Sequence, residues 1–190
     1  MLSRFLMPAI ALALMPALTA CDSSASKKAR SQPSSPTNVA ARRDIPRIQA
    51  DAARCAIAIF SGDIDGLLAL THPRLIEASG GEESARQAWQ QAILRSKLAS
   101  SNTRVETSFP AEPVFLQGKE HEFVVIPLRV VVNRDGVKPV EQRLFPIGIR
   151  RFDQDSWGYT DGASSESMTM LFPDFPGDFE VPEATFKVLD

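Results

Sequence analysis

Residues and motifs that usually carry enzyme chemistry are scarce in this chain of 190 residues. It contains two cysteines, two histidines and one tyrosine. The motifs GxGxxG, GxSxG, HExxH and CxxC and the P-loop are all absent. Two histidines far apart, without cysteines beside them, give no zinc signature. The sequence therefore gives no local support to nucleotide-binding, hydrolase or zinc-dependent functions, and we predict neither a metal nor a cofactor.

An apolar run long enough to span a bilayer is also lacking. Residues 5–18 form a run of 14 residues, interrupted by Pro8 and Pro16, whereas a spanning helix needs about 20 apolar residues. With Arg4 in front of it, the run is typical of the apolar region of a secretory signal. We therefore predict that residues 1–20 are a signal peptide.

The apolar run ends in Leu18-Thr19-Ala20-Cys21. This resembles the lipobox of bacterial lipoproteins, in which the cysteine sulfur receives diacylglycerol and the new amino terminus is usually acylated, typically with palmitate. The resemblance implies a membrane anchor at Cys21, in the bacterial cell envelope and facing the periplasm. The alternative is an ordinary signal with a chance cysteine. Asp22 resembles an inner-membrane retention signal of enterobacteria, but the choice between inner and outer membrane stays open.

The residues that follow are polar. Residues 21–44 hold few large apolar side chains, so they cannot bury enough surface to fold, and we predict a tether there. Residues 45–190 retain 15 of the 21 basic and 21 of the 23 acidic residues, a net charge near −6. Nucleic acid is therefore not an expected partner, because binding it requires clustered cations.

Three helices are predicted at the start of this domain. In residues 45–60, a stripe of Ile48, Ala52, Cys55 and Ile59 has the spacing of an apolar helix face, so Cys55 is expected to be buried.

Two more helices are predicted after the first. A second helix is expected over residues 63–70, where Pro73 stops or bends it, and a third follows Gly80-Gly81. Asp44 is the expected cap of the first helix.

From about residue 105 the apolar residues recur at every second position, which indicates strands. The predicted strands cover residues 105–109, 114–116, 123–132, 140–152 and 157–159. Pro127 and Pro146 lie inside the two long strands, so bulges or edge pairing are expected there. The order predicts an α+β fold, with three N-terminal helices packed on an antiparallel sheet.

Short motifs in a particular order carry a further resemblance. They are Ser61-Gly62-Asp63-Ile64-Asp65, Thr71-His72-Pro73, Gly80-Gly81, Trp157-Gly158-Tyr159-Thr160-Asp161-Gly162 and Leu171-Phe172-Pro173-Asp174-Phe175-Pro176. Over residues 45–175 the chain resembles the superfamily of ketosteroid isomerase and nuclear transport factor two (SnoaL-like proteins). The resemblance implies a cone-shaped, cystatin-like roll with a curved sheet and a cavity. After it, the acids Asp178, Glu180 and Glu183 predict an acidic tail over residues 176–190. The resemblance implies no single function, because members include enzymes, small-molecule binders and docking modules.

Four residues are candidates for a pocket. Tyr159 and Asp161 are two apart on a strand and so face the same side, where a phenol and an acid could do acid–base work. His72 is a candidate for a base or a binding residue in the cavity, and Trp157 is a candidate for lining it. The alternatives are a turn at Asp161-Gly162, a helix-end role for His72 and a sheet-covering role for Trp157. His121, in a polar turn, is expected to be solvated.

Three functions remain in contention. The leading hypothesis is a non-catalytic, lipid-anchored binding module for a small molecule or a protein. The second is an isomerase- or dehydratase-like enzyme that uses Tyr159, Asp161 and His72. The third is a toxin-neutralising (immunity) or secretion-associated scaffold lipoprotein. The resemblance alone also makes a homodimer plausible.

Overall fold

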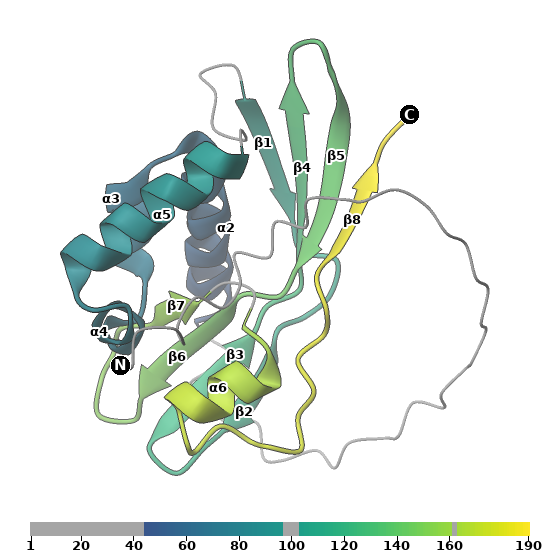
Figure 1. The fold of residues 1–190 in the computed structure, drawn as a ribbon. Coiled ribbons are helices and arrows are strands. Elements are labelled where there is room, and N and C mark those ends of the chain that lie inside the picture. The colour runs from purple at the N-terminus through teal and green to yellow at the C-terminus, as the bar shows by residue number, and fades with distance from the viewer. Residues whose placement is uncertain (1–43, 97–102, 161–162) are drawn as a thin grey trace.

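The computed structural model describes residues 44–96, 103–160 and 163–190. The predicted signal peptide, Cys21 and the predicted tether lie outside the described residues, except for Asp44. The described part is α+β, with five helices and eight strands in two antiparallel sheets (Figure 1). No helix in these ranges is both long and apolar enough to cross a membrane.

The three predicted helices are present. They are α2 (Ile45–Ser61), α3 (Ile64–Leu70) and α5 (Glu82–Ser96). Helix α2 ends at Gly62, whose φ of 77° is the left-handed conformation that glycine adopts without strain. Asp44 occupies the N-cap position of α2, but its side chain makes no capping hydrogen bond. Its carboxylate instead accepts a hydrogen bond from Arg150 at 3.2 Å.

Two further helices were not predicted, so the expectation of three helices ahead of the sheet is incomplete. Pro73 does end the run of α3, but it also starts α4 (Pro73–Ala78), because proline is tolerated in the first helical turn. Helix α6 (Ser165–Leu171) lies late in the chain, ahead of the last strand, and the Ser164 side chain caps it by accepting from the backbone N–H of Ser167.

The strands form two sheets where the sequence predicted one. One sheet has the order β1-β4-β5-β8 and the other β2-β3-β6-β7. The strands are β1 (Thr103–Ser108), β2 (Val114–Gln117), β3 (His121–Val125), β4 (Leu128–Arg134), β5 (Val137–Leu144), β6 (Ile147–Arg151), β7 (Gly158–Thr160) and β8 (Thr185–Val188).

The two prolines explain the division. Each predicted long strand is broken, at Ile126-Pro127 between β3 and β4 and at Phe145-Pro146 between β5 and β6. The two breaks are adjacent, since the Ile126 N–H donates to the Pro146 carbonyl at 3.0 Å. Proline has no N–H for a ladder, so each run leaves one sheet and enters the other at this point. The irregularity expected at the prolines is therefore a break, and the bulge of this hairpin lies between Val132 and Arg134 instead.

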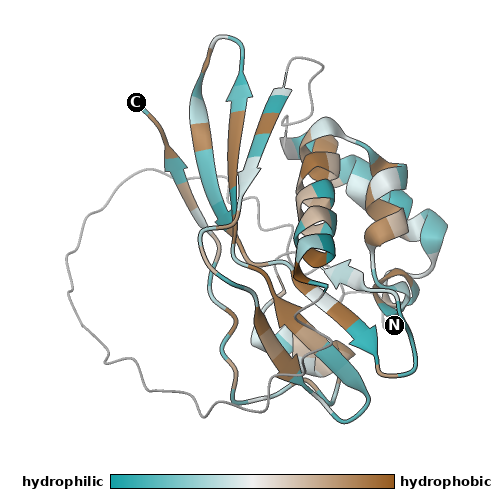
Figure 2. Cartoon of the chain, turned by 180° about the vertical axis from the view of Figure 1, so that it is seen from behind, coloured by the Kyte–Doolittle hydropathy of each residue, from teal (hydrophilic) through white to brown (hydrophobic). Residues whose placement is uncertain are grey.

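Helix α2 supplies the apolar layer between the sheets and the helices α3 and α5 (Figures 1 and 2). Its Ala56 and Phe60 pack against Leu128, Val130 and Val132 of β4. The second sheet is covered on its other side by the C-terminal segment, where Met168, Phe172 and Phe175 pack against β3 and β6. Strands β5 and β8 extend the first sheet beyond α2, which packs on β1 and β4.

Candidate functional site

Three of the four candidate residues meet around β7. Thr71, just before α4, bridges to Tyr159, and the backbone N–H of His72 donates to the Tyr159 carbonyl at 3.1 Å. A Cβ on Gly158 would lie 2.6 Å from the Cα of His72, so only glycine permits this approach. Asp161, the fourth candidate, lies outside the described residues.

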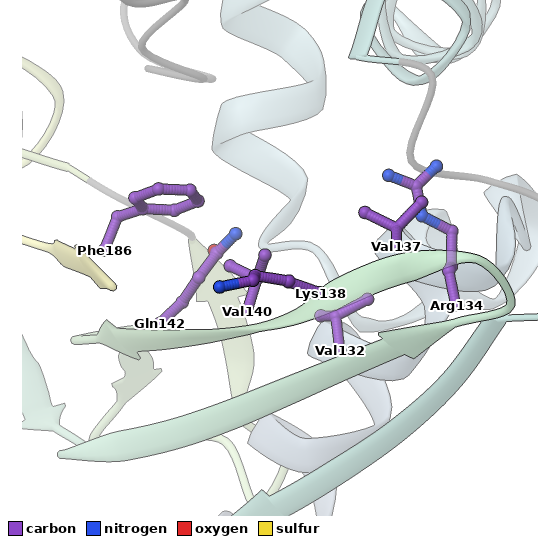
Figure 3. Close-up of a pocket in the computed structure, with 7 residues that line it drawn as sticks. All are labelled: Val132, Arg134, Val137, Lys138, Val140, Gln142 and Phe186. Atoms are coloured by element: carbon purple, nitrogen blue, oxygen red, sulfur yellow. The ribbon is translucent and has the colours of Figure 1, made fainter. Parts of the chain in front are cut away.

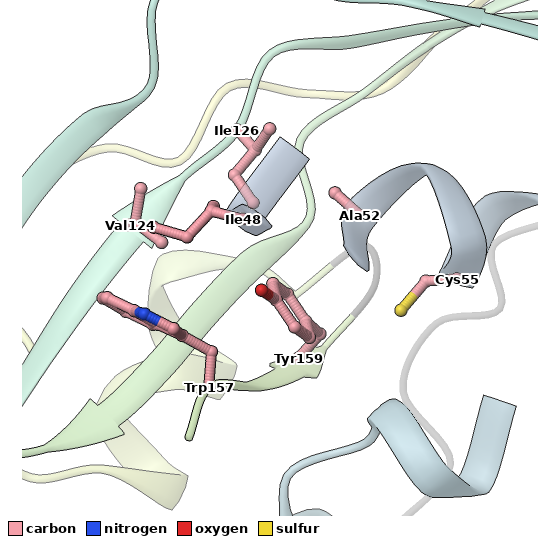
Figure 4. Close-up of a cluster of buried hydrophobic side chains, with 7 residues drawn as sticks. All are labelled: Ile48, Ala52, Cys55, Val124, Ile126, Trp157 and Tyr159. Atoms are coloured by element: carbon pink, nitrogen blue, oxygen red, sulfur yellow. The ribbon is translucent and has the colours of Figure 1, made fainter. Parts of the chain in front are cut away.

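The side chains nevertheless point to opposite sides of β7. Trp157 and Tyr159 are two residues apart and share one face, whereas His72 lies against Gly158 on the other. Figure 4 shows both aromatic rings beside α2, which contributes Ile48, Ala52 and Cys55 to the same buried cluster. Cys55 is buried, as predicted. The structure thus brings the His72 backbone to Tyr159, but it does not bring the imidazole and the phenol together.

The phenol of Tyr159 has a buried partner on α2. Its hydroxyl donates to Oδ2 of Asp51 at 3.2 Å, and the side chain of Arg54 forms an ion pair with Oδ1 of the same carboxylate. Tyr159 is 2% exposed and Asp51 8%. Burial and the neighbouring charge of Asp51 raise the pKa of Tyr159, so the phenol stays neutral and acts as a donor.

Asp51 is a residue that the sequence reasoning missed, although a signal was present. It follows Ile48 by three positions and precedes Cys55 by four, so it lies on the same face of the helix as the apolar stripe. An acid at such a position must be paired, because burying an unpaired carboxylate is costly. Its partner Tyr159 is 108 residues away, and no local pattern identifies it.

Trp157 lies beside a second set of charges. The Arg150 guanidinium stacks over the indole at 4.5 Å from the ring centroid, a cation–π contact. The same guanidinium bonds Glu122 at 2.6 Å and Asp44 at 3.2 Å. Because Arg150 is occupied by two carboxylates and a ring, it serves to join β3 and β6 to the start of α2.

The other face of β7 carries a histidine cluster. Nδ1 of His121 lies 3.0 Å from Oδ1 of Asp174, and Oδ2 accepts the backbone N–H groups of Glu120 and His121 at 2.9 and 3.0 Å. His121 is 5% exposed, so the prediction that it is solvated is wrong. The reason is a contact with Asp174, 53 residues further along the chain. Its carboxylate binds the polar groups of this segment in place of water.

Two histidine rings meet in this cluster. The rings of His72 and His121 have centroids 6.5 Å apart, and Phe172 packs edge-on against both. Burial, His121 and Arg74 lower the pKa of His72 to about 4. Nδ1 of His72 accepts the N–H of Arg74 at 3.2 Å as the N-cap of α4. The histidine therefore does lie at a helix end, but at the start of α4 and not on the last carbonyls of the helix before it, as the sequence had suggested.

The pKa of Asp174 is also shifted. Burial acts to raise it, but the hydrogen bonds from Glu120 and His121 outweigh burial and lower the pKa of this carboxyl. The pair resembles a base with its orienting acid. A substrate, however, would have to reach an imidazole enclosed by Phe123, Phe172 and His72.

Two surface hollows lie among the described residues, and Arg54, the ion-pair partner of Asp51, lines one of them. One, of about 400 Å³, runs between α2 and α3 and is lined by residues such as Ile57, Ala58 and Leu70. The other, of about 40 Å³, lies on β4, β5 and β8 (Figure 3). Neither is lined by His72, Trp157 or Tyr159. Across residues 44–96, 103–160 and 163–190 there is also no group of three His, Cys, Asp or Glu side chains that could hold a metal ion.

Comparison with protein-family models and with curated proteins gave no match to this chain.

Proposed function

We propose that this chain is a lipid-anchored protein of the bacterial envelope, whose folded domain binds a partner protein and does not catalyse a reaction. One observation carries the proposal. Tyr159 is bonded to Asp51 inside the fold and His72 caps α4, whereas apolar side chains of β5 and β8 stand exposed at an open sheet edge. Phe186 is 58% exposed, Val137 55% and Val188 47%. Exposed apolar groups gathered in this way are typical of interaction sites.

The anchor in this proposal is Cys21, which the lipobox resemblance assigns. A tether over residues 21–44 would hold the domain near the membrane, and its basic residues would favour anionic head groups. The finer fold is part of the proposal too. Helices beside a sheet whose long strands bend at Pro127 and Pro146 suit the curved, cone-shaped roll of the ketosteroid isomerase and nuclear transport factor two superfamily.

The anchor is tested by fractionation and intact mass. The native chain is expected in the membrane fraction, with a mass that corresponds to cleavage before Cys21 plus acyl chains, and Cys21→Ser should leave a soluble protein. A matched Ser23→Ala variant should remain in the membrane. An unacylated native chain in the soluble fraction would contradict the anchor.

The binding function is tested by site-specific photo-crosslinking in the native cell. A crosslinking residue at Gln142, in the hollow of β5, is expected to give a discrete protein adduct. The same residue at Gln90, on the exposed side of α5, is the control and should give none. If neither Gln142 nor Phe186 gives an adduct above the Gln90 background, the proposed function is wrong.

A further inference from the structure

The strand β8 is the most accessible part of the first sheet. All four of its residues are exposed, and it pairs with β5 alone, in the register Val140↔Val188 to Arg143↔Thr185. The other edge strand of that sheet, β1, packs against α2. Strand β8 is therefore an edge without a cover in the part of the chain that the structure describes.

The backbone of β8 offers hydrogen bonds on its outer side. The N–H of Leu189 donates to the carbonyl of Pro139 at 2.8 Å. In an antiparallel pair, hydrogen-bonded and non-bonded positions alternate, so Lys187 and Thr185 also face β5. The N–H and carbonyl groups of Phe186 and Val188 consequently point away from the sheet, where an added strand would meet them.

The side chains on one face of this edge are apolar. Phe186 and Val188 lie beside Gln142 and Val140, their cross-strand partners. Figure 3 shows Phe186, Val140 and Val132 on the same side of the strands, around the hollow of about 40 Å³. An apolar side chain of an added strand would extend this row and bury part of Phe186.

The charged groups near the edge are mainly cationic. Arg134 and Lys138 line the hollow, and Lys138 forms an ion pair with Asp190 at 3.2 Å. On the opposite face, Lys187 and Arg143 lie beside Glu141, whose carboxylate already bonds Arg129 and Arg143. Acidic side chains on that face of an added strand would therefore complement Lys187, and basic ones would be repelled.

We propose that β8 binds an extended segment of a partner protein, which adds to the sheet as a fifth strand and alternates apolar with acidic residues. This is the β-augmentation mode of recognition, in which the main chain gives affinity and alternate side chains give specificity. The inference rests on the proposed binding function, and it specifies the kind of segment that the partner presents.

A second copy of this chain fits the edge less well. The antiparallel register that places Phe186 opposite Val188 also places the two Lys187 side chains opposite each other, and like charges in that position destabilise pairing. A four-residue strand also buries far less than the roughly 1,200–2,000 Å² of a stable protein interface. A short segment, bound with modest affinity, is the occupant that such an edge suits.

The test uses two peptide libraries and the purified full chain carrying Cys21→Ser. One library holds octapeptides that alternate Val, Ile, Leu or Phe with Asp or Glu, and the other holds the same compositions with the apolar residues grouped together. Alternating peptides are expected to be enriched, and the best of them should shift the amide signals of β8 in NMR spectra. Replacing its acids by lysines should weaken binding about tenfold or more.

Matched variants locate the site. Val188→Pro removes an outward N–H and should weaken binding about tenfold, whereas Val188→Thr keeps the N–H and the branched shape and should stay within about threefold. Phe186→Ser should weaken binding, and Phe152→Ser, at a residue of similar exposure, should not. Unchanged signals elsewhere in the sheet show that each variant is folded.

Three outcomes would overturn the inference: no enrichment of alternating peptides, equal binding by Val188→Pro and Val188→Thr, or concentration-dependent self-association that Val188→Pro abolishes. If peptides fail while the crosslink at Gln142 persists, the edge inference alone is wrong. If both fail, the proposed function falls with it.

Discussion

At the scale of single residues, the described part of the chain places its reactive groups in closed pairs. Tyr159 donates to Asp51 between β7 and α2, and Asp174 accepts from His121 between the C-terminal segment and β3. Buried polar groups retain their partners because an unmet donor or acceptor costs more than a hydrogen bond gains. These pairs therefore specify how distant segments fit together.

Removal of the Tyr159 hydroxyl tests this structural role. Tyr159→Phe is expected to lower the free energy of unfolding by about 1.5 kcal/mol, since the lost hydrogen bond goes to a charged carboxylate. In a double-mutant cycle with Asp51→Ala, the coupling energy should be about 1 kcal/mol. Urea denaturation measures all four proteins. Additivity of the two single changes within about 0.5 kcal/mol would show that the pair contributes little.

At the scale of elements, close backbone approaches join the C-terminal segment to the second sheet. Gly118, in the turn between β2 and β3, lies directly against Asp174, and a Cβ there would be 2.6 Å from the Asp174 carbonyl oxygen. The same turn supplies the N–H groups that bind the Asp174 carboxylate. A side chain at Gly118 would push the two segments apart and stretch these hydrogen bonds.

Gly118→Ala is therefore expected to destabilise the fold by about 1–3 kcal/mol, the usual range for overpacking. Gly177→Ala is the matched control, because nothing lies within 4 Å of a Cβ at that position, and its effect should stay within about 0.5 kcal/mol. Thermal or urea unfolding compares the two variants. Equal stabilities would mean that the C-terminal segment adjusts to the added methyl group without cost.

At the scale of the whole molecule, the histidine cluster makes stability depend on pH. The pKa of His72 falls from its ordinary value of 6.5 to about 4 in the fold, so the unfolded chain binds a proton that the folded chain does not. Stability from this group is full above pH 6.5 and is lost as the pH falls towards 4. The lowered pKa of Asp174 acts in the same direction, because its contribution is present above its ordinary value of 3.8 and is lost at lower pH.

His72→Asn isolates the histidine contribution. Asparagine can still cap α4 but does not titrate, so the variant should lose less stability than the native chain between pH 6.5 and 4. Urea denaturation at several pH values measures the difference. Parallel pH profiles for the two proteins would mean that His72 is not the group responsible.

The sequence by itself determined the helices α2, α3 and α5 and the strand-forming runs of β1 to β7, but not α4, α6 or β8. The stripe of Ile48, Ala52 and Cys55 gave α2 and its buried face, and alternation gave the strands, because both patterns are periods of a single element. Pro127 and Pro146 marked the places where the long strands fail, since a missing N–H is a property of the residue alone.

Only the tertiary structure decided which elements meet. It divided the meander into two sheets, buried His121 beneath Asp174 and placed Asp51 opposite Tyr159. It also paired residues 185–188 of the expected acidic tail with β5 as strand β8. Each of these contacts joins residues more than 40 positions apart in the chain. The energy of each contact depends on which surfaces stay exposed after the helices have packed. The spacing of residues within one element does not contain that information.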